Sequence, residues 1–348
     1  MLKVGIIGIG FMGYTHFEAA KFADKVTITA IATRSEKKRA GDWTGIQGNF
    51  GPPAGQVDLS NVKTYADYHQ LLADPNIDLV DICLPTDQHH QVVMDSIAAG
   101  KATLVEKPIA VSQSEAEEMV QAAESAGVPL LVGHVLPYFP EFQYAANAIQ
   151  SGEFGPLKGA HFRRVICPPD WSDGMGDFRK LGGWGIDLHI HDNHFIAHAC
   201  GRPTAVFSNG LLQDGFVNHV HTSYVFGENG PAVTAVSGGI AASGMAFGHG
   251  FELYLEDATI VFDAGTYAGE WVINRPLSLI RNDGSVTAVD LEGDDSWCAA
   301  FALELQQAGA HVTEGADAGA LASRVALDAL KMCYAEAESM QKKQIVEL

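Results

Sequence analysis

Residues 1–33 contain the pattern that most restricts how this chain can fold: an apolar run, a glycine-rich turn, a helical stretch and a second apolar run. Residues 2–9 (LKVGIIGI) are typical of a strand that is buried on both faces. Gly8, Gly10 and Gly13 then precede the helical stretch YTHFEAAKFA, and the second apolar run, VTITAIAT, covers residues 26–33. This order is the fingerprint of a dinucleotide-binding βαβ unit, whose glycines let the backbone approach a pyrophosphate. A tight strand-to-helix turn without a ligand is the alternative.

Apolar runs that alternate with helical patterns continue to about residue 135. DLVDICLP (78–85), TLVEKP (103–108) and VPLLVGHV (128–135) are each short and predict further buried strands. This alternation predicts an α/β fold with a doubly wound parallel sheet, whose ligands bind outside the carboxyl ends of the strands. We therefore assign residues 1–133 to a Rossmann dinucleotide-binding domain. Four side chains follow the predicted strand ends: Thr86, His89, Glu106 and Lys107.

The sequence from residue 134 onward has a different pattern. β-type runs broken by Gly, Asn, Pro and Asp occur at residues 156–167 and between 204 and 291, and they predict successive strands joined by short turns. Residues 296–312 and 317–343 have apolar positions three and four residues apart and predict two closing helices. We assign residues 134–348 to a second, α+β domain.

The end of the second predicted strand bears on the choice of dinucleotide. NAD-binding proteins usually carry Asp or Glu there, to bond the adenosine ribose. This chain has Thr33 and Arg34, followed by Lys38 and other basic residues. Because a hydroxyl beside an arginine can accept a 2'-phosphate that a carboxylate would repel, NADP(H) is slightly favoured over NAD(H). The alternative is that the basic residues merely form a solvated helix start.

The charge balance argues against two classes of partner. The chain has 42 acidic and 22 basic residues and a formal net charge of -20. This surplus repels the phosphates of nucleic acids and of anionic lipids, so we expect neither a nucleic-acid nor a membrane partner. The five cysteines are scattered without CxxC spacing, and the N-terminal apolar run lacks the features of a signal peptide. Both observations lead us to expect a cytoplasmic protein.

Residues 182–195, GGWGIDLHIHDNHF, raise the question of a metal site. On a strand, Asp187, His189 and His191 would share one face and could bind an ion. The later sequence, FIA followed by the stop signal Gly201-Arg202-Pro203, instead predicts a helix from about 184 to 200. His189 then points roughly 160° away from His191, so we assign no metal site.

On this predicted helix, four titratable residues form one stripe: Asp187, His191, His194 and His198. Apolar residues flank the stripe on both sides. Such a row is costly unless it faces a cavity or is hydrogen-bonded. Two other interpretations stay open, a hydrogen-bonded seam between the helix and a sheet, and a transition-metal site.

Four motifs follow one another in the order and spacing of a known family: Gly8-x-Gly10-x-x-Gly13-x-x-His16, LPTDQHH (84–90), AAGKATLVEKP (98–108) and Asp187-x-x-x-His191. With them the chain resembles, over essentially its whole length, the glucose-fructose oxidoreductase / inositol dehydrogenase / MocA (Gfo/Idh/MocA) family. The resemblance implies that the second domain binds substrate and contains a large, mostly antiparallel open sheet. It also implies a homodimer or homotetramer that assembles through the exposed face of this sheet.

The resemblance further implies roles for individual residues. Lys107 matches a lysine that contacts the nicotinamide ribose and the substrate hydroxyl, and Asp187 and His191 match the pair at the reacting carbon. Together with the glycine fingerprint, the predicted cofactor-binding residues are Gly8, Gly10, Phe11, Met12, Gly13, Thr33, Arg34, Lys38, Pro85, Thr86, His89, Glu106 and Lys107. The predicted substrate-binding residues are Lys107, Asp187, His191 and His194.

The chain departs from the family pattern at two positions. His194 stands where members often carry aspartate, and Pro137 stands where they often have arginine. Both departures indicate a substrate different from the best-known sugars, or an altered reaction.

The chemistry of these residues supports a dehydrogenase. Moving a hydride from a carbinol carbon to nicotinamide also requires a base for the hydroxyl proton and a cation for the developing alkoxide. His191 and Lys107 can supply them, so we expect an oxidoreductase that acts on a secondary hydroxyl or ketone of a sugar, polyol or related carbohydrate. The alternatives are an NAD-using glycoside hydrolase or dehydratase, and a non-catalytic dinucleotide sensor on the same fold.

Overall fold

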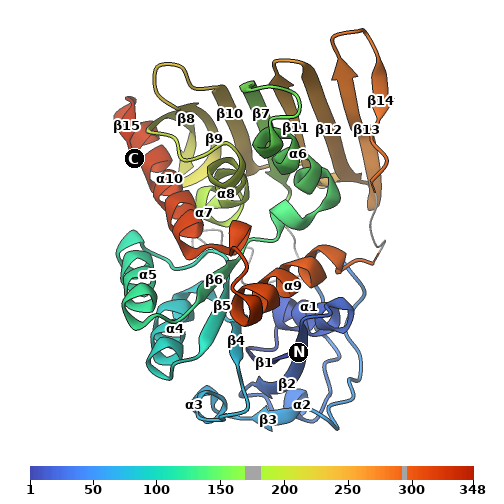
Figure 1. The fold of residues 1–348 in the computed structure, drawn as a ribbon, viewed down its shortest axis with the longest axis vertical. Coiled ribbons are helices and arrows are strands. Elements are labelled where there is room, and N and C mark those ends of the chain that lie inside the picture. Colours follow the sequence, from blue (N-terminus) through green and yellow to red (C-terminus); the bar gives the residue numbers. More distant parts are fainter. Residues whose placement is uncertain (169–181, 292–295) are drawn as a thin grey trace. The chain divides into compact units, whose positions relative to one another are not determined.

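The computed structural model describes residues 1–168, 182–291 and 296–348, and the chain forms two compact units (Figure 1). Unit 1 comprises Met1–Tyr138 and Gly293–Leu327, and unit 2 comprises Phe139–Glu292 and Asp328–Leu348. The predicted second domain covers residues 134–348, whereas the segment Gly293–Leu327 belongs with unit 1. The physical reason is that the apolar face of helix α9 (Ala299–Glu314), including Phe301 and Leu305, completes the core of the N-terminal sheet.

Unit 1 is built on a six-stranded sheet in the order β3-β2-β1-β4-β5-β6. All of its strand pairs are parallel, which confirms the predicted doubly wound sheet. The strands are β1 (Leu2–Ile7), β2 (Val26–Ala32), β3 (Lys63–Tyr65), β4 (Leu79–Ile82), β5 (Ala102–Glu106) and β6 (Leu130–Gly133). Strands β4 and β5 are buried along their whole length, as expected when helices cover both faces of a parallel sheet.

The helices of unit 1 begin and end where the sequence supplies local signals. Helix α5 (Gln113–Ala126) starts with a capping box between Ser112 and Glu115 and stops at Gly127, whose φ is 64°. The other helices are α1 (Phe11–Ala19), α2 (Glu36–Arg39), α3 (Tyr68–Leu72), α4 (His89–Ala98) and α9, with short 3-10 turns η1 (Ala20–Phe22), η2 (Thr86–Gln88), η3 (Leu136–Tyr138) and η5 (Gly319–Leu321).

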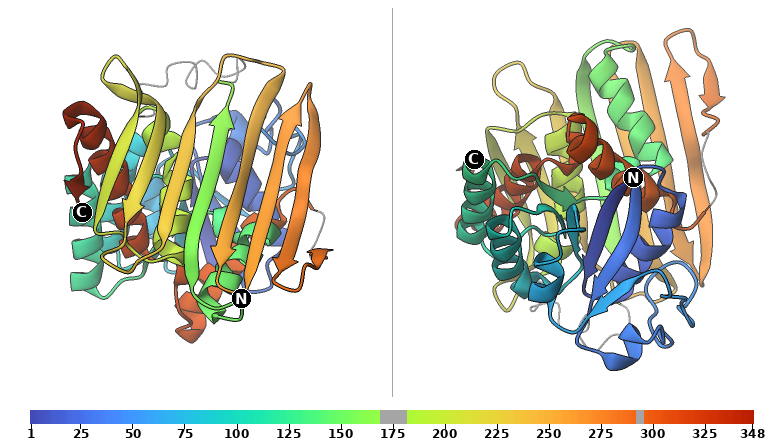
Figure 2. Two further views of the ribbon diagram at one scale, coloured as in Figure 1. Left: turned by 90° about the horizontal axis from the view of Figure 1, so that it is seen from above. Right: turned by 60° about the horizontal axis from the view of Figure 1, so that its bottom comes forward.

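Unit 2 contains a nine-stranded sheet in the order β14-β13-β12-β11-β7-β10-β9-β8-β15, which Figure 2 shows side by side. Only the pair β7–β10 is parallel, so the predicted large, mostly antiparallel sheet is confirmed. The strands are β7 (Leu157–Ile166), β8 (Ala205–Gln213), β9 (Phe216–Val225), β10 (Ala232–Gly239), β11 (Met245–Leu255), β12 (Ala258–Tyr267), β13 (Glu270–Arg281), β14 (Val286–Ala288) and β15 (Val346–Glu347).

The described residues of unit 2 form helices α6 (Pro140–Ser151), α7 (Trp184–Asp187), α8 (Ile190–Ala199) and most of α10 (Ser323–Lys342). Phe142 of α6 and Phe195 of α8 pack edge-on at 5.3 Å, and Phe142 also contacts Phe251 of β11. This aromatic core fixes the helices on one face of the sheet. Large apolar side chains such as Leu211, Trp271 and Ile273 are more than half exposed, and assembly through the open sheet face stays a prediction.

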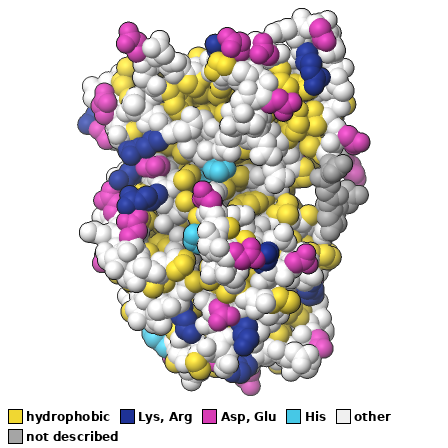
Figure 3. All heavy atoms as spheres, viewed as in Figure 1, with side chains coloured by type: hydrophobic (Ala, Val, Ile, Leu, Met, Phe, Trp, Pro, Cys, Tyr) yellow, Lys and Arg dark blue, Asp and Glu magenta, His cyan; other side chains and the backbone are white. Residues whose placement is uncertain are grey.

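The charged side chains on the surface reflect the acidic composition of the chain. Acidic side chains are scattered over the face shown in Figure 3, in keeping with the excess of 42 acidic over 22 basic residues. Of the helices in the described ranges, none combines the length and apolarity that crossing a bilayer demands.

Candidate active site

The glycine loop between β1 and α1 has the geometry of a dinucleotide cradle. Gly8 has a φ of 96°, and a side chain there would meet the carbonyl oxygen of Cys83 at 2.6 Å. A Cβ on Gly13 would lie 2.1 Å from the carbonyl oxygen of Gly8, so Gly13 is required for close packing of α1. A Cβ on Gly10 would meet nothing within 4 Å. The fold itself therefore needs two of the glycines, whereas Gly10 leaves open space where a pyrophosphate can approach the backbone.

The start of α1 supplies the donors for such a ligand. Gly10 is the N-cap of this nine-residue helix. Because glycine has no side chain, no capping side chain accepts the N–H groups of the first turn. Of the other predicted loop residues, Phe11 packs against Phe50 with ring centroids 4.8 Å apart, and Met12 packs against the core. The residues present fit a bound dinucleotide.

The end of β2 gathers basic side chains close to this loop. Lys38 Nζ donates to the carbonyl oxygen of Ile9, at 2.5 Å, and burial lowers the pKa of Lys38. Arg39 donates to the carbonyl oxygen of Thr33 at 2.7 Å. Arg34 is exposed. Lys38 thus touches the glycine loop directly, and Arg39, which was not among the predicted site residues, shapes the turn at Thr33.

The next strand end, after β4, carries Pro85, Thr86 and His89. Pro85 is exposed and Thr86 half-buried, and both stand at the start of the 3-10 turn η2. His89 is buried, with Nδ1 2.9 Å from the carbonyl oxygen of Pro108 and Nε2 2.9 Å from that of Leu84. Burial lowers the pKa of His89. Its ring therefore ties two strand-end turns together, and a cofactor contact by His89 stays a prediction.

Lys107 follows β5 at the same sheet edge as the glycine loop, because the strands are parallel. Its side chain is half-buried, and its backbone N–H donates to Glu106 Oε2 at 3.1 Å. Glu106 is itself 8% exposed. The predicted lysine thus sits on a turn that a buried carboxylate holds.

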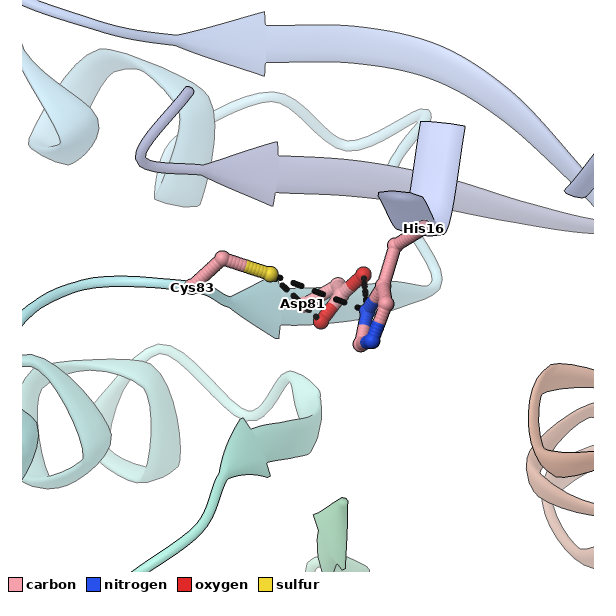
Figure 4. Close-up of side chains that lie close together, drawn as sticks. All are labelled: His16, Asp81 and Cys83. Carbon is pink, nitrogen blue, oxygen red and sulfur yellow. Dashed lines mark hydrogen bonds and ion pairs between the residues drawn. The ribbon is translucent and has the colours of Figure 1, made fainter. Parts of the chain in front are cut away.

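Behind Lys107 lies a buried group of titratable side chains, of which only Glu106 was among the predicted site residues. His16 Nδ1 lies 2.8 Å from Asp81 Oδ2, and the Cys83 thiol lies 3.6 Å from the same nitrogen (Figure 4). His16 Nε2 lies 3.1 Å from Glu106 Oε1, at ion-pair distance but outside hydrogen-bond geometry. Glu304 of α9 is buried in the same unit. The histidine at the end of the GxGxxGxxH motif was the available signal.

Electrostatics favour an imidazolium at His16. Burial alone would lower the pKa of His16, but the Asp81 carboxylate and then Cys83 oppose this, and the pKa lies well above its ordinary value. Burial raises the pKa of the Cys83 thiol, so the thiol is not a reactive thiolate. Among the described residues, His16, Asp81 and Cys83 are the one set of His, Cys, Asp or Glu side chains compact enough for a metal ion. Their mutual hydrogen bonds and an imidazolium account for the cluster without one.

In unit 2 the predicted helix 184–200 is divided. Helix α7 ends at Asp187 and α8 begins at Ile190, so Leu188 and His189 interrupt the helix. His189 N bonds the carbonyl oxygen of Trp184 at 2.8 Å, five residues back, and Asp192 N bonds that of His189 at 3.0 Å, three residues back. The single continuous helix is therefore wrong in this detail, because tertiary bonds of the His189 ring override the regular backbone pattern.

Those tertiary bonds place His189 in the interior of unit 2. Its Nδ1 lies 2.7 Å from Ser237 Oγ on β10, and its Nε2 lies 3.1 Å from Glu336 Oε1 on α10. Burial opposes protonation, but Glu336 outweighs it and the pKa of His189 is raised. A buried Arg164–Asp192 pair, with two hydrogen bonds of 3.0 Å, anchors α8 to β7.

The residues of the predicted stripe differ from one another in exposure. Asp187, His191 and His198 are half-buried, whereas His194 is fully buried. The rings of His194 and His198 stack with centroids 6.4 Å apart, as side chains four residues apart on one helix face do. Asp187 and His191 therefore keep partly exposed side chains.

Comparison with known proteins relates the N-terminal part of the chain to a known family. Residues 2–134 match the GFO_IDH_MocA family model, described as "Oxidoreductase family, NAD-binding Rossmann fold". A myo-inositol 2-dehydrogenase from Thermotoga maritima is 26% identical over 214 residues, 61% of this chain and 59% of that relative's length. A 2,7-anhydro-N-acetylneuraminate hydratase from Escherichia coli is 22% identical over 300 residues, 84% of this chain and 68% of that relative.

The whole fold is shared with solved structures. The crystal structure of a probable dehydrogenase from Thermotoga maritima superimposes with a TM-score of 0.77 at 22% identity, covering 99% of this chain and 98% of that one. The matched sequence, the glycine cradle and the two sheets lead to one assignment. Residues 2–134 thus match the Gfo/Idh/MocA family of oxidoreductases, with an NAD-binding Rossmann fold, and the later part of the chain shares the fold of solved structures.

Proposed function

We propose that this protein is an NAD(P)-dependent dehydrogenase that transfers a hydride between nicotinamide and a secondary hydroxyl or ketone of a sugar, polyol or related carbohydrate. The observation that carries the proposal is the position of Lys107. This cation follows β5 at the sheet edge where the glycine loop opens, and in doubly wound sheets this edge binds the ligand. A bound dinucleotide would supply the hydride acceptor.

The chain's own residues supply the remaining chemistry. We assign to Lys107 the stabilisation of the developing alkoxide, because an ammonium group at the substrate oxygen lowers the energy of that charge. His191 accepts the hydroxyl proton, and Asp187 orients the imidazole or the substrate. His194, buried in unit 2, replaces a carboxylate acceptor with an imidazole, which favours a substrate other than the best-known sugars.

For the cofactor we propose NADP(H) as slightly favoured over NAD(H). The turn after β2 offers the hydroxyl of Thr33 and the exposed guanidinium of Arg34, with no carboxylate at the position where NAD-binding proteins carry one. Lys38, at the glycine loop, adds a second cation. Cations of this kind favour a 2'-phosphate.

The remaining proposals concern assembly and place of action. We propose a homodimer or homotetramer through the open sheet of unit 2, where apolar side chains such as Trp271 are exposed. We propose no nucleic-acid or membrane partner, and action in the cytoplasm.

A screen of sugars and polyols with NAD and with NADP, following reduced nicotinamide, tests the function. Reduction that depends on one of these substrates is expected. A second candidate is supported by the hydratase relative, whose alignment of 300 residues is longer than the 214 residues aligned to the inositol dehydrogenase. A protein that purifies with bound dinucleotide, and turns over a carbohydrate without net redox change, would favour hydration or elimination instead.

A further inference from the structure

The carboxyl group of Glu304 is buried without a hydrogen-bond partner. Helix α9 places the side chain in the interior of unit 1, where Glu304 is 1% exposed, and neither oxygen has a partner among the described residues. A buried carboxylate in this condition is costly, and its protonated form costs much less. Burial raises the pKa of Glu304 well above its ordinary value, and Glu106 and Asp81 add to this effect while His16 opposes it.

Two carboxyl groups meet in the space beside Gly133. A methyl group added to Gly133 would lie 2.8 Å from Glu304 Oε1 and 3.6 Å from Glu106 Oε1. Gly133 ends β6 and pairs with Glu106 of β5, and its φ lies outside the left-handed region. The backbone therefore does not require glycine here. The missing side chain instead leaves room for the Glu304 carboxyl group, whereas the 3.6 Å to Glu106 Oε1 is an ordinary van der Waals contact.

Glu106 connects this space to the candidate catalytic lysine. One of its oxygens, Oε2, accepts the backbone N–H of Lys107 at 3.1 Å, and the other, Oε1, lies 3.1 Å from His16 Nε2. An ionised Glu106 attracts both the backbone N–H and the His16 imidazolium, whereas a protonated carboxyl group would lose that charge. The charge on Glu106 therefore bears on how firmly the turn at Lys107 is held.

The charges around Glu304 do not balance if every carboxyl group is ionised. Asp81, Glu106 and Glu304 would carry three negative charges against one positive charge on His16, whereas a proton on Glu304 leaves a surplus of one. The other titratable groups near the cluster are the Cys83 thiol and the Tyr138 phenol, whose pKa values are raised by burial, and the His134 imidazole, which follows Gly133 in the chain. Neither the thiol nor the phenol can supply a second positive charge.

We propose that Glu304 is a positioning residue for Lys107: it holds a proton in the space beside Gly133, so that Glu106 stays ionised and keeps its bond to the backbone of Lys107. Two carboxyl groups that share a site cannot both ionise at low cost. A proton on Glu304 removes one of the two negative charges, so Glu106 can stay ionised. This inference rests on the proposed function, because it assigns Lys107 to the reaction.

Infrared spectroscopy of the whole protein tests the proton directly. The wild-type spectrum at neutral pH should contain the carbonyl stretch of a protonated carboxylic acid, and the Glu304→Gln difference spectrum should show its loss. An unchanged carboxylic-acid region would overturn the proposal. This measurement needs no substrate, so a failure of the proposed function and a failure of this inference are told apart.

Kinetics test the positioning role, with dinucleotide affinity as the control. Glu304→Gln is neutral and able to donate, so its kcat should stay within about threefold of wild type. In wild type, ionisation of Glu304 should lower kcat at high pH, and Glu304→Gln should lack this loss. Glu304→Leu should lower kcat about tenfold or more without changing the dinucleotide Kd. Equal kcat and equal pH profiles in all three proteins would overturn the proposal.

A second variant covers the case in which Glu304→Leu does not fold. Gly133→Ala has an unstrained backbone but puts a Cβ 2.8 Å from Glu304 Oε1, so the carboxyl group must move. It should lower kcat in the same direction and shift the pH profile, with KM for the dinucleotide unchanged. A Gly133→Ala protein with wild-type kcat and pH profile would contradict the inference.

Discussion

His189 and Glu336 form a buried ion pair in unit 2, with Nε2 and Oε1 3.1 Å apart and neither side chain more than 1% exposed. Tyr224 and Asn193 also donate to the Glu336 carboxylate, at 3.0 and 2.8 Å. The pair joins His189, the residue directly before α8, to α10. It therefore holds the helix that carries His191.

Removing the charge of Glu336 should destabilise the protein strongly. Glu336→Gln leaves the His189 imidazolium buried without its counter-ion, and we expect a loss of about 3–5 kcal/mol in the free energy of unfolding. Chemical denaturation measures it. Glu338→Gln is the matched control on the same helix, because Glu338 forms an exposed pair with Lys342 and should cost less than about 1 kcal/mol. Equal losses in the two variants would contradict the buried pair.

The same pair makes stability depend on pH. The raised pKa of His189 means that the folded protein keeps a proton that the unfolded chain releases. The contribution is fully present below the unfolded pKa of about 6.5 and is lost as pH rises through the folded pKa. The difference in Tm between wild type and His189→Gln should therefore shrink as pH rises from about 6.5 into the alkaline range. Parallel curves would show that His189 is neutral in the folded state.

The N-terminal half of the fold could be predicted from the sequence because its signals are local. The glycine turn, the apolar strands and the helix after Gly13 each follow from adjacent residues. The division between α7 and α8 could not be predicted in this way. It depends on bonds from His189 to Ser237 and to Glu336, which is 147 residues away in the chain.

The position of Glu304 could not be predicted from the sequence either. Its sequence neighbours indicate an amphipathic helix, and the prediction of that helix is correct. Which sheet the helix covers depends on the return of the chain to unit 1, and no local pattern encodes that return. The sequence therefore indicated only part of the cluster behind Lys107, through His16 of the glycine motif.

Substitutions at two glycines of the loop should separate an effect on folding from an effect on dinucleotide binding. Gly13→Ala should lower stability by about 1–3 kcal/mol or more, since its Cβ would lie 2.1 Å from the carbonyl oxygen of Gly8. Gly10→Ala meets no protein atom within 4 Å, so its stability should stay within about 1 kcal/mol of wild type. The dinucleotide Kd of Gly10→Ala should rise about tenfold or more, which corresponds to a loss of ~1.4 kcal/mol in binding free energy. Thermal melts and dinucleotide titration check both, and unchanged affinity in Gly10→Ala would contradict the cradle.

The preference for NADP(H) can be tested at Thr33. A carboxylate introduced by Thr33→Asp would repel a 2'-phosphate and bond the ribose of NAD, so kcat/KM for NADP should fall relative to NAD by about tenfold or more. Arg34→Ala should act in the same direction. Glu36→Ala, one turn away on the exposed start of α2, is the control. A wild-type protein that strongly prefers NAD would refute the assignment.

The central claim is that Lys107 acts on the substrate oxygen, and Lys107→Met tests it most directly. Lys158→Met, which alters an exposed lysine paired with Glu256, is the control. The measurement is kcat on the substrate found by the screen, alongside dinucleotide Kd for each variant. We predict that Lys107→Met lowers kcat by about 100-fold or more while the dinucleotide Kd stays near wild type. A Lys107→Met protein that turns over at a rate close to wild type would contradict the account.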